Sequence, residues 1–397
     1  MRSKMNDFNY YAPTKVVFGK GAEQKVGNLI KEQNCKKVLI HYGSGSARRS
    51  GLLDRIEAIF DKEGITYVEL GGVVPNPRLS LVYEGIALCK KENVDFILAV
   101  GGGSVIDSAK AIGYGVANEG DVWDFFDFKR KPTACLPIGV VLTIAAAGSE
   151  MSGSCVITKE DGGMKRGCTT DYSRLKFAVL DPELTMTLPP YQTACGCTDI
   201  LMHTMERYFN HGENMELTDG ISEALMRTVI RNAKILVKEP ENYDTRAEIV
   251  WAGTLAHNGL LNTGRVQDWA SHRIALEMSG LYDIAHGASL SIVYPAWMEY
   301  VYSHDKKRFM QFAVRVWDVD LAYGEEDEIC LEGIRRMREF FKKLGMPLTF
   351  EDAGLPTDAF EEMADKATYG DTIPVGNFVK IGKSQMIDIY KLCTERK

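Results

Sequence analysis

Four residues in the second half of the chain have the side chains of a divalent-metal site. Asp199 and His203 lie four positions apart in a stretch of helical character, and His272 and His286 follow them. Residues i and i+4 of a helix share one face, so this carboxylate and imidazole could bind one ion without bending the backbone. Carboxylate and imidazole ligands together suit Fe(II) and Zn(II), and such an ion with an open coordination position acts as a Lewis acid.

An isolated Asp-x-x-x-His pair has a second explanation, because such a pair is commonly found on a protein surface without a metal. The metal hypothesis therefore depends on the rest of the chain, where two further imidazoles are available. The other histidines and the C-x-C pair match no ligand pattern. We expect core or surface positions for His41, His211, His257, His304, Cys195 and Cys197.

A glycine-rich turn in the first half predicts a binding site for the pyrophosphate of a dinucleotide. Gly101, Gly102, Gly103 and Ser104 follow the apolar run VDFILAV and open the helical pattern SVIDSAKAIG. Glycine lets a ligand approach the backbone closely, and the N–H groups at a helix start attract phosphate. The turn lacks the G-x-G-x-x-G spacing, so an ordinary tight turn is the alternative.

Two charged residues of the following helical pattern, Asp107 and Lys110, are not expected to bind a ligand. Ser104 and Asp107 have a spacing similar to that of a capping box, in which the side chains satisfy N–H groups at the helix start. Lys110 lies one turn further on, and we expect it to be solvated on the helix surface.

A second polar loop bears on the choice between NAD and NADP. It contains Gly43, Ser44 and Ser46, followed by Arg48 and Arg49. A carboxylate near such a loop holds the ribose 2′-hydroxyl of NAD, whereas an arginine accommodates the 2′-phosphate of NADP. No acidic residue follows until position 54, so the loop favours NADP(H). NAD stays open as the alternative cofactor.

The elements that would carry these residues differ between the two halves of the chain. Continuous apolar runs at residues 36–42, 65–70, 94–100 and 135–143 predict buried strands, and amphipathic patterns predict helices at 51–62, 79–92 and 104–116. Strands that are apolar on both faces and alternate with helices are typical of a parallel sheet covered on both sides.

After Pro189 and Pro190 the pattern becomes helical. Long amphipathic stretches cover residues 191–209, 215–237, 243–261, 269–278 and 331–344, with few strand candidates. Consecutive prolines do not continue a strand or a helix interior, so they mark a boundary. We therefore expect an α/β dinucleotide-binding domain at residues 1–185 and an all-α, metal-binding domain at residues 186–397.

Composition excludes several classes of protein. The chain has 397 residues and a formal net charge of −7, which disfavours nucleic-acid binding because phosphate neutralisation requires a basic face. It has no apolar run of the roughly 18 residues that a membrane span requires, and its N-terminus lacks the apolar core of a signal peptide. Nine cysteines without a regular framework fit a reducing compartment. We expect a cytoplasmic protein with no membrane or nucleic-acid partner.

Several segments at matching spacing resemble the iron-containing (group III) alcohol dehydrogenases. These are GGGSVIDSAK from Gly101, LTIAAAGSEMS from Leu142, LDPELTMTLPP from Leu180, TDILMHTMERY from Thr198, and the pair His272 and His286-Gly. KEPENYD, QDWASH and YPAW are similar to the butanol dehydrogenase subgroup of NADPH-dependent aldehyde reductases. The resemblance covers nearly the whole chain.

The resemblance implies roles for particular residues. The metal ligands of the family correspond to Asp199, His203, His272 and His286, and its phosphate loop corresponds to the turn at Gly101–Ser104. Thr143 matches a residue beside the cofactor phosphates, and Lys165 matches a basic residue near the nicotinamide ribose. A homodimer that acts on a small aldehyde or alcohol is also implied. Many members carry a further histidine four positions after the third ligand, where this chain has Leu276. A proton relay at that position is therefore in doubt.

Together these observations predict a metal-dependent NADP(H) alcohol dehydrogenase that reduces short-chain aldehydes to primary alcohols. An NAD-dependent polyol dehydrogenase of the glycerol type is one alternative. A dehydroquinate-synthase-like lyase is another, but its phosphorylated substrate would need several cations near the metal. Only Arg207 and Arg273 accompany the expected ligands.

Overall fold

The computed structural model describes residues 5–212 and 215–394, and the chain forms two compact units. An α/β unit contains Tyr11–Leu188 and Glu241–Thr254, and a helical unit contains the other described residues. The expected boundary at residues 185/186 lies near the break after Leu188. It takes no account of residues 5–10 and Glu241–Thr254, which belong to the opposite unit from their neighbours in sequence. The sequence gives no sign of the boundary between Thr254 and Leu255, because one helix, residues 243–257, continues across it.

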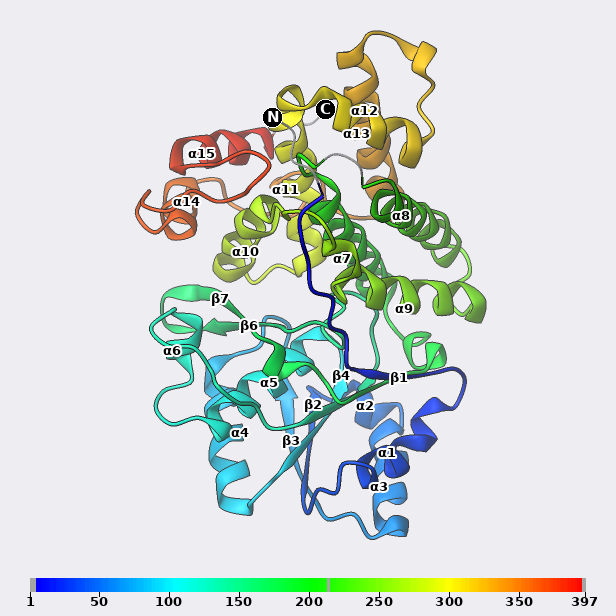
Figure 1. Cartoon of the computed structure of the whole chain (residues 1–397), viewed down its shortest axis with the longest axis vertical. Helices are drawn as coiled ribbons and strands as arrows, with labels where there is room; N and C mark the ends of the chain where they lie inside the picture. Colours follow the sequence, from blue (N-terminus) through cyan, green and yellow to red (C-terminus); the bar gives the residue numbers. More distant parts are fainter. Residues whose placement is uncertain (1–4, 213–214, 395–397) are drawn as a thin grey trace. The chain divides into compact units, whose positions relative to one another are not determined.

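A six-stranded sheet in the order β1-β8-β5-β4-β2-β3 forms the core of the α/β unit, and all its neighbouring strands are parallel (Figure 1). The four expected strands are β2 (Val38–Gly43), β3 (Tyr67–Val73), β4 (Phe96–Gly101) and β5 (Ile138–Leu142). Every residue of β4 and β5 is buried, as continuous apolar runs require. The predicted parallel α/β architecture is confirmed.

The remaining strands were not expected from the sequence. β1 (Lys15–Phe18) and β8 (Phe177–Leu180) have four residues each, too few to show a distinct pattern. β6 (Ser154–Lys159) and β7 (Met164–Thr169) form a separate antiparallel hairpin with mixed polar and apolar residues.

Helices flank the sheet and follow its strands in sequence. The long ones are α3 (Leu52–Glu63), α4 (Leu79–Glu92) and α5 (Gly103–Ala117), close to the predicted ranges. Shorter helices are α1 (Val26–Lys31), α2 (Ser46–Arg49) and α6 (Trp123–Phe126). The chain goes from β2 to β3 on one side and from β4 to β5 on the other, so the strand order reverses between β2 and β4. The carboxyl ends of two such strands form the crevice in which open α/β sheets bind ligands.

Two expectations for α5 were wrong. Lys110 is fully buried instead of solvated, and its Nζ donates to the carbonyl oxygens of Ser149, Ser152 and Ser154 and to Ser149 Oγ at 2.7–2.9 Å. Asp107 does not take part in a cap, because Gly102 is the N-cap residue and has no side chain to bond. The carboxylate of Asp107 instead accepts from Ser149 Oγ at 2.6 Å. Both side chains therefore fasten the loop after β5 to α5.

The described C-terminal part of the chain is helical, apart from one isolated bridge between Val375 and Ile381. The predicted helices are α7 (Pro190–Tyr208), α8 (Glu216–Leu236), α9 (Tyr243–His257), α10 (Ala270–Tyr282) and α13 (Glu326–Lys343). Four more are α11 (His286–Val301), α12 (Lys306–Trp317), α14 (Phe360–Thr368) and α15 (Lys383–Leu392). Pro295 lies inside α11 and obscured its pattern.

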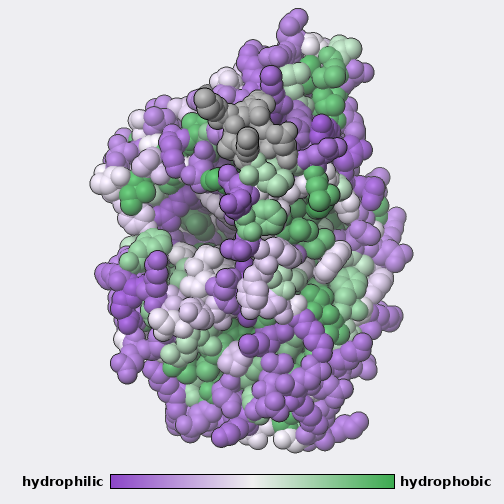
Figure 2. All heavy atoms as spheres, in the orientation of Figure 1, coloured by the Kyte–Doolittle hydropathy of each residue, from purple (hydrophilic) through white to green (hydrophobic). Residues whose placement is uncertain are grey.

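On the face drawn in Figure 2, hydrophilic side chains predominate and hydrophobic ones form small patches between them. Among the described residues, no helix combines the length and the hydropathy needed to cross a bilayer. Cys195 and Cys197 are buried within α7, as expected for core residues.

Candidate active site

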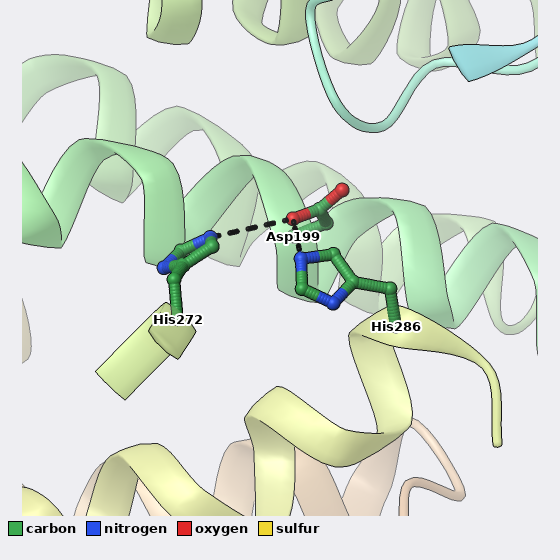
Figure 3. A group of neighbouring side chains, drawn as sticks. All are labelled: Asp199, His272 and His286. Carbon is green, nitrogen blue, oxygen red and sulfur yellow. Dashed lines mark ion pairs between the residues drawn. The ribbon is translucent and has the colours of Figure 1, made fainter. Parts of the chain in front are cut away.

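Three of the four predicted metal ligands meet within the helical unit. His272 on α10 and His286 at the first position of α11 both direct their imidazoles toward Asp199 on α7 (Figure 3). The distances to Asp199 Oδ1 are 3.9 Å from His272 Nε2 and 3.8 Å from His286 Nε2. The potential ligand atoms of these residues all lie within 4.8 Å of one another. Three helices that are separate in sequence thus contribute to one cluster.

Close packing between α7 and α11 allows this meeting. Gly287 follows His286, and a Cβ atom at Gly287 would lie 2.3 Å from the carbonyl oxygen of Cys195. Real Cβ atoms do not approach a backbone oxygen so closely, so only glycine permits this helix contact. Asp199 is one turn beyond Cys195 on α7. Gly287 is therefore required for the close packing of α11 against α7 that places His286 near Asp199.

His203 lies beside this cluster and outside the group of mutually close ligand atoms. Its Nδ1 is 3.3 Å from Asp199 Oδ1, and its ring centroid is 4.7 Å from that of His272. The i, i+4 spacing did bring Asp199 and His203 together on α7. The ring of His203 also packs against His257, with a centroid distance of 4.4 Å.

Sequence reasoning missed two neighbours of the cluster. His257, the last residue of α9, matches no motif of the chain, yet it contacts His203. The Trp269 ring lies 5.0 Å from the His272 ring and 5.9 Å from the His203 ring. Leu276, which replaces the family histidine, is on α10 and brings no imidazole to the group. The proximity of His257 depends on tertiary packing, so no local spacing could have revealed it.

The electrostatics of the buried imidazoles differ from one ring to the next. Burial, together with the neighbouring rings of His257 and His272, holds the pKa of His203 well below its usual value. Burial also acts to lower the pKa of His272, but the carboxylates of Asp199 and Glu206 outweigh it and leave that pKa raised. A metal ligand must present an unprotonated nitrogen, so a proton on Nε2 of His272 would compete with metal binding.

The observed geometry fits a divalent cation. Metal–nitrogen and metal–oxygen bonds to Zn(II) are about 2.0–2.2 Å, so two ligand atoms of one ion lie up to about 4.3 Å apart. The nitrogen–oxygen distances of 3.8 and 3.9 Å lie within that limit and are too long for direct hydrogen bonds. Within the described chain, the buried Nε2 of His272 also has no hydrogen-bond partner. Asp199, His272 and His286 would hold the ion, with His203 adjacent.

The two predicted cofactor loops lie at the carboxyl ends of β2 and β4, which are neighbours in the sheet. Thr143 follows β5, the next strand, and its N–H donates to Gly101 O at 3.1 Å. Gly43, Ser44 and Ser46 thus share one sheet edge with Gly101, Gly102, Gly103, Ser104 and Thr143. The sequence predicted both loops, and the sheet order brings them together where a dinucleotide would bind.

The glycines of the Gly101–Ser104 turn have a packing role that does not involve a ligand. A Cβ atom at Gly102 would lie 1.9 Å from Ile144 Cγ2, and one at Gly101 would lie 2.4 Å from Val105 Cγ2. Larger residues there would disturb the protein itself, whether or not a pyrophosphate binds. A substitution that tests the cofactor role must therefore leave these positions unchanged.

Ser104→Asp is expected to weaken the binding of both NADH and NADPH about tenfold or more. Ser104 is the second residue of α5, where an aspartate would repel a pyrophosphate yet favour the helix dipole. Calorimetry on the variant, with Ser104→Asn as a neutral control of equal size, measures the effect. If cofactor affinity is unchanged in the folded aspartate variant, the turn does not bind pyrophosphate.

Arg48 has carboxylate partners within the protein. Its guanidinium forms ion pairs with Asp54 at 3.0 Å, Glu57 at 2.5 Å and Glu69 at 2.5 Å. Glu57 comes from α3 and Glu69 from β3, so the sequence of the loop did not reveal them. The same residues place carboxylates near the loop, which weakens the argument for NADP from Arg48.

Lys165 is on β7, where it is buried and donates to Asn76 Oδ1 at 2.8 Å. Asn76 lies between Pro75 and Pro77 and has a φ of 55°, which asparagine tolerates better than most residues. The pair thus joins the hairpin to the loop after β3. A contact between Lys165 and the cofactor ribose stays a prediction.

Comparison with known proteins gives a consistent result over both units. The family "Iron-containing alcohol dehydrogenase" matches residues 13–182, and "Fe-containing alcohol dehydrogenase family, C-terminal" matches residues 193–394. The chain is 42% identical to the probable NADH-dependent butanol dehydrogenase 1 of Bacillus subtilis (strain 168), over 98% of this chain and 99% of that protein. It is 37% identical to the NADPH-dependent aldehyde reductase YqhD of Escherichia coli (strain K12), over 91% of this chain and 93% of the relative.

A solved structure is similar at the level of the whole fold. The NADH-dependent butanol dehydrogenase A of Thermotoga maritima matches with a TM-score of 0.95 and 38% identity, over 99% of this chain and 100% of that one. The resemblance seen in the sequence motifs is thereby confirmed. The chain belongs to the iron-containing alcohol dehydrogenase family and is an alcohol dehydrogenase or aldehyde reductase.

Proposed function

We propose that this protein reduces short-chain aldehydes to primary alcohols by hydride transfer from a nicotinamide cofactor. The observation that carries the proposal is the meeting of Asp199, His272 and His286 at distances that fit one divalent ion. His203 is the fourth proposed ligand, because its Nδ1 lies 3.3 Å from Asp199 Oδ1. Fe(II) and Zn(II) both suit this combination of ligands.

The bound metal would polarise the carbonyl oxygen, while the reduced nicotinamide supplies the hydride. The residues of the chain provide binding and orientation. Asp199 is the anionic ligand, and the imidazoles add neutral ligands that leave the ion positively charged. The N–H groups at the start of α5 would bind the cofactor pyrophosphate beside Ser104. Thr143 and Lys165 are proposed to contact the phosphates and the nicotinamide ribose.

For the cofactor, NADH is the proposed preference, although the loop sequence alone favours NADPH. Three carboxylates engage Arg48, so its charge is compensated within the protein. The named relatives include both NADH-dependent and NADPH-dependent enzymes. An NAD-dependent polyol dehydrogenase would share this preference, so the substrate panel must include glycerol.

The lyase alternative needs free cations for a phosphorylated substrate, and the two arginines nearest the proposed ligands in sequence have other partners. Arg207 is buried, stacks on Trp269 at 4.7 Å, and donates to Asn262 Oδ1 and His203 O, both at 2.5 Å. Arg273 lies over the Tyr369 ring at 5.3 Å. Both guanidinium groups are used to hold the helical unit together.

Initial rates with NADH and NADPH, measured against aldehydes and glycerol on protein of known metal content, test this proposal. We expect kcat/KM with butanal to exceed that with glycerol, and NADH to be used at least as well as NADPH. Arg48→Ala removes the cation that compensates three carboxylates, so the cofactor ratio should move further toward NADH if the loop lies beside the ribose.

Gly43→Asp tests whether the loop at Gly43–Ser46 contacts the cofactor ribose. A Cβ atom at Gly43 would meet only Val73 O at 3.5 Å, an ordinary contact, so the variant should fold. Its carboxylate would repel a 2′-phosphate and should move the ratio of kcat/KM toward NADH by about tenfold. A parent that prefers NADPH would overturn the cofactor preference. A ratio that Gly43→Asp does not move would show that this loop does not contact the ribose.

A further inference from the structure

We propose that Glu206 is a positioning residue that fixes His272 for metal binding, an inference that rests on the proposed function. Glu206 is on α7, seven residues after Asp199, and is fully buried. Its Oε1 accepts from His272 Nδ1 at 2.7 Å and from the backbone N–H of His272 at 3.0 Å. One carboxylate oxygen therefore holds both the ring and the backbone of the same residue.

The ring contact determines which imidazole nitrogen can bind a metal. With Nδ1 donating its proton to Glu206, Nε2 keeps the lone pair, and this atom faces Asp199 Oδ1 at 3.9 Å. Carboxylates that accept from the distal nitrogen of a ligand histidine fix its tautomer and raise its basicity. Without Glu206, the ring of His272 could rotate and exchange its two nitrogens.

The other oxygen of Glu206 fixes the position from which His272 projects. Oε2 accepts from the N–H of Trp269 at 2.7 Å, and Glu206 O accepts from the N–H of Asp268 at 2.9 Å. Trp269 is the N-cap residue of α10 and has a φ of 68°, a conformation that large side chains rarely adopt. The hydrogen bond to Glu206 stabilises this strained turn immediately before His272.

The charge of Glu206 also fits a cation in this position. Its carboxylate accepts three hydrogen bonds from residues 269–272, at the N-terminal end of α10, where a negative charge is favourable. An ionised Glu206 would add its charge to that of Asp199 in attracting a divalent ion.

Metal affinity separates this role from a general structural one. The affinity for Zn(II) can be measured by titrating the apo protein in competition with a chelating dye. Glu206→Gln should bind Zn(II) about 10–100-fold more weakly than the parent. Asp268→Asn is the matched control, because Asp268 is also a buried carboxylate that accepts backbone N–H groups, but it does not contact the ring. The Co(II) forms of the parent and of Asp268→Asn should have the same absorption spectrum, and that of Glu206→Gln should differ.

Parent-like Zn(II) affinity and a parent-like Co(II) spectrum in Glu206→Gln would overturn the proposal, as would equal weakening by Asp268→Asn. The tautomer can be checked without any substitution in Glu206. Nitrogen-15 spectra of histidine-labelled parent protein, assigned with His272→Gln, should show His272 protonated at Nδ1, and protonation at Nε2 would contradict the inference. If His272→Gln itself binds Zn(II) as tightly as the parent, the metal assignment fails instead.

Discussion

Asp199→Asn is expected to empty the metal site and to lower aldehyde reduction by about 1,000-fold or more. Asp199 Oδ1 is the atom that the imidazoles of His203, His272 and His286 all face, and a neutral amide is a poor ligand for a divalent cation. A Lewis acid contributes several kcal/mol to the stabilisation of a developing alkoxide, which corresponds to a loss of this size. Metal content and single-turnover reduction by the variant measure both effects.

The control for this prediction is cofactor binding, because the proposed cofactor loops belong to the α/β unit and Asp199 belongs to the helical unit. Affinity for NADH should stay within about twofold of the parent value, since no ligand of the cofactor has changed. His272→Ala should behave in the same way. A metal-free variant that reduces aldehydes at the parent rate would refute the metal-dependent mechanism.

Lys110→Met is expected to destabilise the protein by about 3–5 kcal/mol, the loss that follows when one partner of a buried charged cluster is removed. Three carbonyl oxygens and Ser149 Oγ would lose their donor, and Asp107 would lose a nearby positive charge. The midpoint of urea unfolding measures the change. Methionine has a similar length, so packing alone should not account for a loss this large.

A lysine on the surface of the same unit provides the comparison. Lys91→Met, near the end of α4, removes an exposed charge and should change stability by no more than about 0.5 kcal/mol. Equal unfolding midpoints for Lys110→Met and the parent would show that the buried contacts contribute nothing. Because these contacts hold the loop after β5 against α5, the unstable variant should also bind NADH more weakly.

The sequence predicted what depends on local pattern. The strands β4 and β5 are apolar and buried along their whole length, so the sequence alone identifies them. The spacing of Asp199 and His203 likewise places both on one helix face, whatever the positions of the other helices. Both proposed cofactor loops could be identified in the sequence because a glycine-rich turn after a buried strand is itself a local signal.

What could not be predicted depends on partners distant in sequence. The acceptors of Lys110 lie in a loop about forty residues away, so its helical pattern resembled that of a solvated lysine. The ion pairs of Arg48 with Glu57 and Glu69 could not be predicted, because these partners come from α3 and β3. Glu206 follows His203 by three residues, but its significance depends on α10, which places His272 against it.

The assignment of Glu241–Thr254 to the α/β unit has a consequence for synthesis on the ribosome. The buried Glu150 accepts from Thr254 Oγ1 at 2.6 Å, and Phe18 packs against Trp251 with a ring distance of 6.4 Å. Neither contact can form until the chain beyond residue 254 has emerged from the exit tunnel, long after β8 has been made. The nascent α/β unit therefore stays incomplete while residues 189–240 are translated, and its uncovered apolar surface is exposed to aggregation during that interval.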